Sequence, residues 1–511
     1  MQYDIIFISG EIYFDHPLCG TAILKRLLEK YGYKVGVIEK PVKEEEIKQL
    51  GQPKLFFAVS SGAIDSMVRN YTPLKKRRGE DEHSDYDENV PDRAVTVYCN
   101  WLRKNYKNTP LIIGGTEATL RRFVHYDYWE NRLRKSILLD SRADLLVYGP
   151  GEKQILEIAA LIKAGKKLEM IPGTCMVSRE LPDKFTELPG EEEVMASKEK
   201  FGQMQLGLNN HNLAQKTGKR YVIQHKSPEY TSADLDEYYE LPFSRTIPLK
   251  RLRGFEFSIV THRGCFGNCS FCALQLVQGE KIISRSEKSI LKEIGNLTKL
   301  PHFKGNVDDL GGPSANMYGM DCHKCNLNRC LDCPQLDRSH SKLLELLRKA
   351  RKIKGIKKIN IRSGIRYDLA PREYVQELAE HHLYDTLRIA PEHVNKEVLK
   401  LMNKDWGNLN EFIDFFNGLN CGKELSYYYI TAHPGSSMKE AKELAGAVKG
   451  LRNVNLQVFT PTPMTLSTCM YYTGINPING KKVYVPYTYR EKKEQKNIVM
   501  EQLEGKDKEM M

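Results

Sequence analysis

Strands and helices alternate along the second half of the chain, and this alternation limits its fold more than any other feature. Six apolar stretches read as strands, at 255–261, 305–310, 358–362, 386–390, 425–431 and 455–459. Between them lie stretches with helical periodicity, at 286–299, 339–354, 371–383, 394–418 and 437–451. Because a strand, a helix and the next strand build a parallel sheet through right-handed crossovers, this half predicts an α/β fold with a parallel sheet.

Three cysteines follow the first of these strands at the spacing C-x3-C-x2-C: Cys265, Cys269 and Cys272. Cysteine thiolates hold iron–sulfur clusters, normally four to a cluster, so a triplet can hold three irons of a cubane and leave the fourth open. Gly264 and Gly267 allow the backbone to bend close to the inorganic core, because glycine has no Cβ. The alternatives are three unrelated thiols or a structural zinc site, although zinc usually takes four ligands in two pairs.

The triplet, with Phe271 directly before its third cysteine, resembles the signature of the radical S-adenosylmethionine (SAM) enzymes. The resemblance implies that Cys265, Cys269 and Cys272 bind a [4Fe–4S] cluster, that the open iron chelates SAM, and that Phe271 lies near the adenine. An electron from the cluster would then cleave SAM to methionine and a 5′-deoxyadenosyl radical. It also implies a partial (β/α)6 barrel over 251–480, with the active site at the carboxyl ends of its strands.

Phrases at the following strand ends occupy the places of the superfamily's SAM-binding groups. Gly311 and Gly312 stand where a glycine-rich motif binds the SAM amino group, with Pro313 in place of a common glutamate. Ser363 and Arg366, after the third strand, would reach the SAM ribose or carboxylate. Glu392 follows the fourth strand, where an acidic residue can also be the N-terminal charge of a helix. The candidate SAM-binding residues are Phe271, Gly311, Gly312, Ser363, Arg366 and Glu392.

A second set of cysteines lies after the second strand, in the pattern C-x2-C-x4-C-x2-C. Its members are Cys322, Cys325, Cys330 and Cys333. Two C-x2-C pairs are a strong signal for a four-thiolate metal site. An auxiliary [4Fe–4S] cluster, zinc, a redox dithiol and a stapled surface loop all remain open interpretations.

The first 165 residues predict a Rossmann-like domain. Strands are expected at 4–10, 34–39, 55–60, 111–113 and 145–147, with a helix at 22–30. Glycine turns follow the last two strands, and ligands of open α/β sheets bind at such carboxyl ends. The order resembles the cobalamin-binding domain that precedes many radical SAM barrels. The base-off cobalamin motif places a histidine two residues after an aspartate, whereas Asp15 and His16 are adjacent here, so the sequence argues against cobalamin.

The remaining segments are assigned by composition. Residues 166–250 are rich in proline and weakly periodic, so they are expected to form a connector, and the Lys- and Glu-rich residues 481–511 a charged tail. No stretch approaches the roughly 18 apolar residues of a membrane span, and the first residues do not resemble a signal peptide. Twelve cysteines in such a chain favour a reducing cytoplasm.

The net charge of +12 raises the question of nucleic acid. Residues 120–135 are dense in aromatic and basic groups and would suit stacking on RNA. The alternative is that this run is a helix face packed on a neighbouring domain. Nucleic acid therefore stays a candidate partner.

Several phrases together resemble the YgiQ-type radical SAM proteins, over residues 4 to about 480. They include Gly114-Gly115-Thr116-Glu117-Ala118, Ser284-Arg285-Ser286 and Ala390-Pro391-Glu392-His393. One departure is Val277, where the family usually has histidine. The resemblance implies a radical SAM enzyme that takes electrons from a donor such as flavodoxin or ferredoxin. The alternative is a non-catalytic iron–sulfur or zinc sensor or scaffold, with or without RNA binding.

Overall fold

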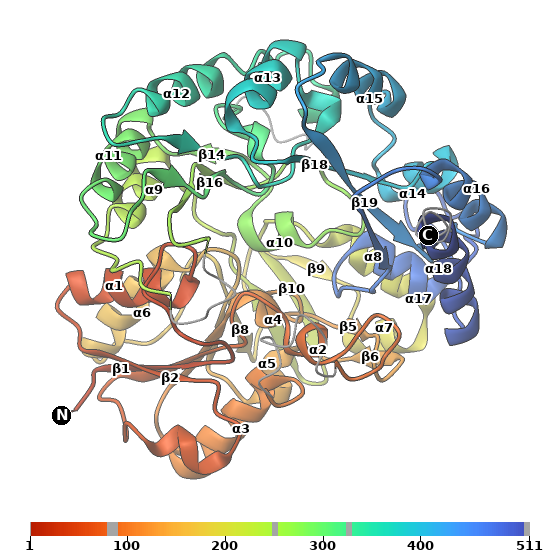
Figure 1. The fold of residues 1–511 in the computed structure, drawn as a ribbon. Helices are drawn as coiled ribbons and strands as arrows, with labels where there is room; N and C mark the ends of the chain where they lie inside the picture. The colour runs from red at the N-terminus through yellow and green to blue at the C-terminus, as the bar shows by residue number, and fades with distance from the viewer. Residues whose placement is uncertain (1, 79–89, 248–253, 323–329, 505–511) are drawn as a thin grey trace. The chain divides into compact units, whose positions relative to one another are not determined.

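The structure is a computed structural model that describes residues 2–78, 90–247, 254–322 and 330–504 (Figure 1). The chain divides into two units. Unit 1 consists of Met1–Glu229, Leu241–Thr246 and Thr460–Lys482, and unit 2 of Tyr230–Glu240, Ile247–Phe459 and Val483–Met511.

A nine-stranded sheet organises unit 1, in the order β2-β1-β3-β4-β7-β8-β11-β10-β9. Its parallel half consists of β1 (Ile5–Ser9), β2 (Val35–Glu39), β3 (Phe56–Ser60), β4 (Leu111–Gly114) and β7 (Leu145–Val147). All five residues of β1 are buried, as expected for a central strand covered on both faces. The five strands and the first helix appear where the apolar runs predict them.

Helices cover this parallel sheet. They are α1 (Gly20–Lys30), α2 (Ser66–Asn70), α3 (Ala94–Asn105), α4 (Gly115–Thr119), α5 (Ile137–Ser141) and α6 (Glu152–Lys163). Apolar residues of β1, β3 and α6, among them Ile5, Phe56 and Ile158, form one core cluster. A hairpin of β5 (His125–Asp127) and β6 (Arg132–Arg134) follows α4.

The segment expected as a connector is more ordered than its composition suggests. Four of its strands extend the sheet of unit 1: β8 (Thr174–Ser178), β9 (Thr186–Leu188), β10 (Leu213–Thr217) and β11 (Arg220–Gln224). The helices α7 (Glu191–Ala196), α8 (Lys198–Gly207) and α17 (Leu466–Thr473) also belong to unit 1. The strand β8 joins the sheet antiparallel to β7, so it completes the sheet of the first domain.

Unit 2 contains the six strands expected of the barrel, in the expected order. They are β12 (Ser258–Val260), β15 (Asn306–Val307) with β16 (Asp309–Gly311), β17 (Lys358–Ile359), β18 (Thr386–Glu392), β19 (Glu424–Thr431) and β20 (Val454–Val458). The pairs β12–β16, β15–β17, β18–β19 and β19–β20 are all parallel. A parallel bridge between Ile365 and Ile389 continues the succession. The predicted fold class, a Rossmann-like domain followed by a partial parallel barrel, is confirmed.

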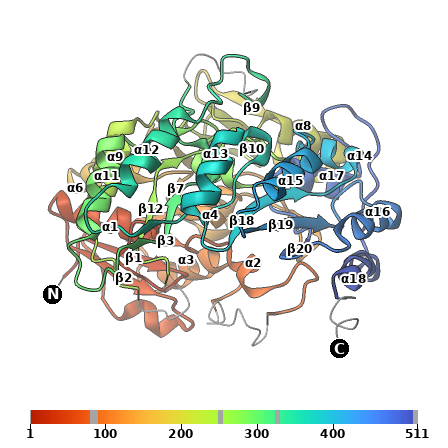
Figure 2. The same cartoon turned by 45° about the horizontal axis from the view of Figure 1, so that its top comes forward.

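Most helices of unit 2 lie outside its strands, whereas α10 (Leu274–Gln278) does not (Figure 1). The helices of this unit are α9 (Ser232–Tyr239), α10, α11 (Glu287–Leu297), α12 (Ser341–Arg351), α13 (Arg372–Glu377), α14 (Lys396–Met402), α15 (Leu409–Gly418), α16 (Met438–Val448) and α18 (Tyr489–Glu504). Figure 2 shows α15 and α16 beside β19. The core of the unit lies between these helices and the strands, and includes Ile259, Leu310, Ile359, Leu387 and Tyr429.

The charged tail includes α18, which packs into unit 2. Its Gln495 and Val499 are fully buried. The Gln495 side chain accepts a hydrogen bond from Ala432 N at 3.0 Å and donates to Ser436 O at 2.7 Å. The helix thereby holds the turn that follows β19.

Candidate functional site

The cysteine triplet lies on the loop between β13 (His262–Arg263) and α10, at the carboxyl end of the first barrel strand. Backbone hydrogen bonds tie this loop down: Cys265 N donates to Gly279 O at 3.1 Å, and Ser270 N donates to Met402 O at 2.8 Å. The Asn403 side chain donates to Asn268 O at 2.8 Å. The C-terminal end of α14 therefore anchors the loop from a point more than 130 residues further along the chain.

Two glycines of the loop are required by the space around them. Gly264 has φ +86°, and a Cβ there would lie far inside van der Waals contact with the Lys281 carbonyl oxygen. A Cβ on Gly267 would lie 2.5 Å from Nη1 of Arg366 and 3.3 Å from the Cys265 sulfur. The groups that approach these glycines closely are thus the Lys281 carbonyl and the Arg366 guanidinium.

Each of the three sulfurs faces an N–H donor. Gly267 N lies 3.4 Å from Cys265 Sγ and Leu274 N lies 3.5 Å from Cys272 Sγ. Arg366 Nη1 lies 3.7 Å from Cys269 Sγ. Hydrogen bonds to ligating sulfurs are one of the means by which a protein tunes an iron–sulfur cluster.

The chemistry of these thiols fits a metal cluster. Burial raises the pKa of Cys265, and it raises the pKa of Cys272 to about 12. Metal binding would require these thiols to lose their protons. In the part of the chain that the structure describes, no three His, Cys, Asp or Glu side chains converge on one point as ligands of a single ion would.

The glycine pair at the end of the second barrel strand is also closely packed. The Gly311 carbonyl accepts a hydrogen bond from Thr261 N at 2.8 Å. A Cβ on Gly311 would lie 3.1 Å from the Ser363 side chain, and one on Gly312 would lie 2.5 Å from the His262 ring. The neighbours leave no room for a side chain at either position, and the Gly311 carbonyl also accepts from the Thr261 hydroxyl at 3.2 Å.

Ser363 and Arg366 are oriented by carboxylates. The Ser363 hydroxyl donates to Asp309, whose carboxylate also accepts from Ser363 N at 3.1 Å. The Arg366 guanidinium binds Asp368, with Nη2 2.5 Å from Oδ2. Asp368 and the Cys269 sulfur thus hold the Arg366 guanidinium between them.

Glu392 lies in an unusual backbone conformation at the end of β18. Its φ is +69°, and the pairing of β18 with β19 shifts register between Ile389 and Glu392. Burial raises the pKa of its carboxyl to about 7, against the opposing charges of Lys404 and Arg366. A carboxyl with this pKa can hold or release a proton near neutral pH.

An aromatic pair faces the loop from the end of β19. The Phe271 ring lies 6.3 Å from the His433 ring, edge to face, and His433 lies 5.0 Å from Phe459. Burial lowers the pKa of His433 to about 3, so its imidazole is neutral. Phe271 thus borders a neutral, apolar surface of the kind that an adenine ring contacts by stacking.

The second cysteine set is described in part, because Cys325 lies outside the described residues. Cys330 begins a 3₁₀ turn, Cys330–Asp332, and Cys333 N donates to Cys330 O at 3.1 Å. Cys330 and Leu331 belong to one apolar cluster with Cys265 and Phe266. The C-terminal half of this motif therefore adjoins the loop of the first triplet.

The sequence analysis missed several residues of this site. They are His262, Asn316, Asp368, Asn403 and Lys404. Only Asp368, two residues after Arg366, had a local signal, since opposite charges so close often pair. The others act across long sequence separations that a single sequence does not reveal.

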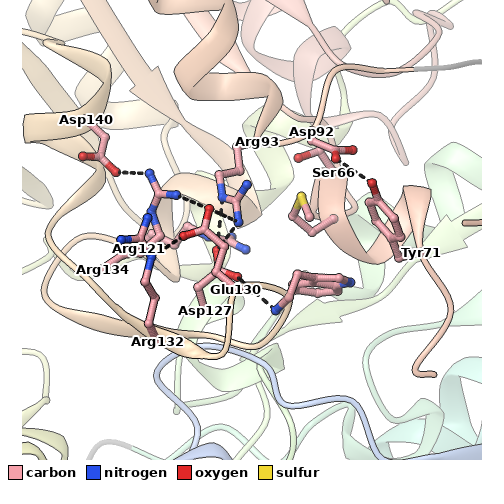
Figure 3. Close-up of polar contacts among 12 residues, drawn as sticks. Ser66, Tyr71, Asp92, Arg93, Arg121, Asp127, Glu130, Arg132, Arg134 and Asp140 are labelled. Atoms are coloured by element: carbon pink, nitrogen blue, oxygen red, sulfur yellow. Dashed lines mark hydrogen bonds and ion pairs between the residues drawn. The ribbon is translucent and has the colours of Figure 1, made fainter. Parts of the chain in front are cut away.

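The aromatic and basic run of residues 120–135 does not form a nucleic-acid surface. Residues 120–128 are buried, including Arg121 and Arg122 at 4% exposure each. Arg121 pairs with Asp65, and Arg93 pairs with Asp127 at 2.7 Å. Figure 3 shows the Arg93 and Asp127 side chains pointing toward one another. The centre of the run is therefore packed, as the alternative predicts, but it includes a strand of the β5–β6 hairpin and pairs within unit 1.

The more exposed part of that run is balanced by its own carboxylates. Arg134 lies 2.8 Å from Glu130 and 2.7 Å from Asp140, and Arg132 lies 2.6 Å from Glu130 (Figure 3). Pairing with carboxylates leaves little net positive potential for a polyanion. The structure gives no support to RNA contact here.

Asp15 and His16 serve the packing of unit 1. Asp15 pairs with Arg26 and accepts from Ser244 N at 2.8 Å. His16 is fully buried, and its Nδ1 accepts from Leu18 N at 3.1 Å. The Asp15-His16-Pro17 segment therefore presents no free imidazole as a cobalamin ligand.

The fold and site define the class of this protein. A parallel α/β barrel that carries a C-x3-C-x2-C loop after its first strand is the architecture of radical SAM enzymes, and residues 259–448 match the model of the radical SAM superfamily. Residues 1–253 match the model of the radical SAM N-terminal region. The chain is a radical SAM enzyme, with a [4Fe–4S] cluster and SAM as the cofactors of its class.

Full-length relatives identify the family. The chain is 43% identical to a UPF0313 protein of Methanocaldococcus jannaschii, over 98% of this chain and 89% of the relative. It is 42% identical to a UPF0313 protein of Methanocella arvoryzae, over 96% of this chain and 89% of the relative. The chain belongs to the UPF0313 family, which confirms the resemblance to YgiQ-type radical SAM proteins.

Solved structures share the fold at low identity. The radical SAM methyltransferase TsrM from Kitasatospora setae, solved with cobalamin and a [4Fe–4S] cluster, aligns with a TM-score of 0.55 at 15% identity, over 92% of this chain and 79% of TsrM. The cobalamin-dependent enzyme OxsB aligns with a TM-score of 0.52 at 13% identity, over 94% of this chain and 56% of OxsB. Because both neighbours bind cobalamin, the expectation that this chain does not bind it finds no support in these comparisons.

Among the described residues, no helix combines the length and the apolar character that crossing a bilayer requires.

Proposed function

We propose that Cys265, Cys269 and Cys272 hold the [4Fe–4S] cluster of this radical SAM enzyme, and that the open iron is the site of SAM. The observation that carries this proposal is the geometry of the loop, in which every sulfur faces a donor: Gly267 N, Leu274 N or the Arg366 guanidinium. Zinc at a structural site would take a fourth protein ligand. When bound, the cluster and SAM supply reductive cleavage to a 5′-deoxyadenosyl radical.

The chain's own residues position and shield these groups. Phe271 and His433 line an apolar edge beside the loop, suited to the adenine ring. Gly311 and Gly312 keep side chains away from the end of the second strand, so that the SAM amino group could approach the backbone there. Glu392 can hold or release a proton near neutral pH beside the thiols.

We infer the partners from the same chemistry. Reductive cleavage requires a one-electron donor, of the flavodoxin or ferredoxin class, and a substrate that loses a hydrogen atom. An oxygen-sensitive cluster and free cysteines suit a reducing cytoplasm. Nucleic acid is not part of the proposal, because the run that suggested it is buried at its centre.

We propose a second metal at Cys322, Cys325, Cys330 and Cys333. The packing of Cys330 in the same apolar cluster as Cys265 favours a redox-active metal, since electron transfer between centres requires proximity. Zinc is the other metal that four thiolates bind well. Metal analysis decides between them.

The test is anaerobic reconstitution followed by reduction with dithionite in the presence of SAM. The wild type is expected to release 5′-deoxyadenosine, and Cys265→Ala, Cys269→Ala and Cys272→Ala are each expected to release none. The quadruple variant C322A/C325A/C330A/C333A is expected to lose about half of the bound iron, as four-iron clusters on each motif require. Iron unchanged and zinc lost would assign zinc to the second motif.

The proposal for the triplet has a clear contrary result. If the single alanine variants keep the iron and sulfide of the wild type, the triplet does not hold the cluster. If the wild type is loaded with iron yet releases no 5′-deoxyadenosine with any donor, the radical chemistry is not that of SAM cleavage.

A further inference from the structure

Arg366 links the proposed cluster loop to a buried carboxylate. Its Nη1 donates to Cys269 Sγ at 3.7 Å, and its Nε donates to Asp368 Oδ1 at 3.1 Å. Its Nη2 lies 2.5 Å from Asp368 Oδ2. The Arg366 and Asp368 side chains are only 4% and 3% exposed, whereas Cys269 is partly exposed, so the cation and the anion lie largely out of water beside the sulfur.

The surrounding chain fixes Arg366 in this position. Asn316 clamps its backbone, accepting from Arg366 N at 2.9 Å and donating to Arg366 O at 2.9 Å. The Gly267 backbone approaches so closely that a Cβ there would lie 2.5 Å from Nη1. The backbone contacts with Asn316 and Gly267 therefore position the guanidinium beside the thiol. The salt bridge to Asp368, two residues along the chain, keeps it there.

The effect of this row on a cluster follows from charge. Adding an electron to a cluster makes it more negative, so a nearby cation or N–H donor stabilises the reduced form and raises the reduction potential. A nearby anion does the opposite. Both effects are large when the groups are buried, because little water screens them.

We propose that the Arg366–Asp368 pair sets the reduction potential of the cluster bound by the triplet, with the guanidinium raising the potential and the carboxylate limiting that rise. The inference rests on the proposed function, since it takes the cluster at Cys269 as given. It makes Arg366 a positioning residue of the cluster rather than a ligand of SAM. Because the change lies in the potential, it can be measured without a substrate.

The experiment is a redox titration of the reconstituted full-length protein without SAM, followed by electron paramagnetic resonance. The titrated signal is assigned to the triplet as the one missing in the variant C265A/C269A/C272A. Arg366→Met is expected to disfavour cluster reduction about tenfold, which corresponds to a potential about 59 mV lower for one electron. Arg366→Lys is expected to lower the reduction potential by a smaller amount, because lysine keeps the positive charge but lacks the planar guanidinium.

Asp368→Asn is expected to shift the reduction potential in the opposite direction to Arg366→Met. Removing the carboxylate is expected to favour reduction and to raise the potential. Arg348→Met is the matched control, because Arg348 also pairs with carboxylates, Glu373 and Glu377, but on the outer helix α12. It is expected to leave the potential of the triplet cluster unchanged.

Two results would overturn the inference. One is a potential that stays the same in Arg366→Met and Asp368→Asn, or that moves in the same direction in both. The other is an unchanged potential with weaker SAM binding in Arg366→Met, which would return Arg366 to SAM. If Arg366→Met takes up no iron, the inference is tested by the directions in which Arg366→Lys and Asp368→Asn shift the reduction potential. A wild type without iron on the triplet would instead contradict the proposed function.

Discussion

At the scale of one residue, the conformation of the cluster loop requires a residue without a side chain at Gly264. Its φ of +86° is a conformation that an L side chain rarely adopts, and the Lys281 carbonyl oxygen fills the position of a Cβ. The two costs add, because the strain of the left-handed region persists even if the carbonyl moves. The loop tolerates only glycine here.

Gly264→Ala is therefore expected to lose most of the iron that the wild type binds. Gly279→Ala is the matched control: Gly279 also has a positive φ, of +101°, but has nothing within 4 Å of the Cβ position. The measurement is iron and sulfide per chain after anaerobic reconstitution. Equal iron in the two variants would show that strain alone, and not the close approach to Lys281, limits this position.

At the scale of an element, α14 supports the cluster loop through its C-terminal end. Met402 accepts from Ser270 N, and Asn403, with φ +51°, ends the helix in the left-handed region while its side chain binds Asn268 O. Left-handed residues commonly end helices, and glycine or asparagine takes that position most readily. Asn403 thus has two separable roles, as a helix cap and as a tether.

Asn403→Gly removes the tether and keeps the cap, whereas Asn403→Ala weakens both. We expect Asn403→Gly to lower the thermal stability of the reconstituted protein by about 1 kcal/mol, the worth of one hydrogen bond. Asn403→Ala is expected to cost more, since alanine is strained in the left-handed region. Thermal unfolding, with and without bound cluster, measures the loss of stability in each of the two variants. An unchanged thermal stability in Asn403→Gly, both with and without bound cluster, would deny the tether.

At the scale of the whole molecule, buried histidines set the response to acid. Burial lowers the pKa of His262, His382 and His393 to about 4, and the pKa of His125 and His433 to about 3. An unfolded histidine titrates near 6.5. Because these folded pKa values are depressed, the unfolded chain binds more protons below about pH 6.5, and stability falls as the pH falls from there toward 4.

Each such histidine is expected to remove about 1.4 kcal/mol of stability per pH unit between pH 6 and pH 4.5. The measurement is the urea midpoint across this range at constant ionic strength. His382→Gln, which removes one of these groups, should flatten the slope, and His211→Gln, at an exposed position, should leave it as in the wild type. A slope that is equal in all three proteins would contradict this account.

The sequence by itself determined the parts of this protein that local patterns encode. Cys265, Cys269 and Cys272 lie within eight residues, so their spacing alone indicates a cluster loop. The period of apolar residues placed the barrel strands, because a buried parallel strand reads as a continuous apolar run. The family phrases placed the chain among radical SAM enzymes, as its relatives confirm.

Only the tertiary structure decided which distant residues meet. The strands β8 to β11 joined the first sheet because their backbone groups needed partners that no local pattern names. The same dependence on distant partners buried Arg121 against Asp65, docked Gln495 under the turn after β19, and turned Arg366 toward Cys269. The sequence shows which side chains are charged or polar. Whether such a side chain faces water or a buried partner depends on contacts between segments that lie far apart along the chain.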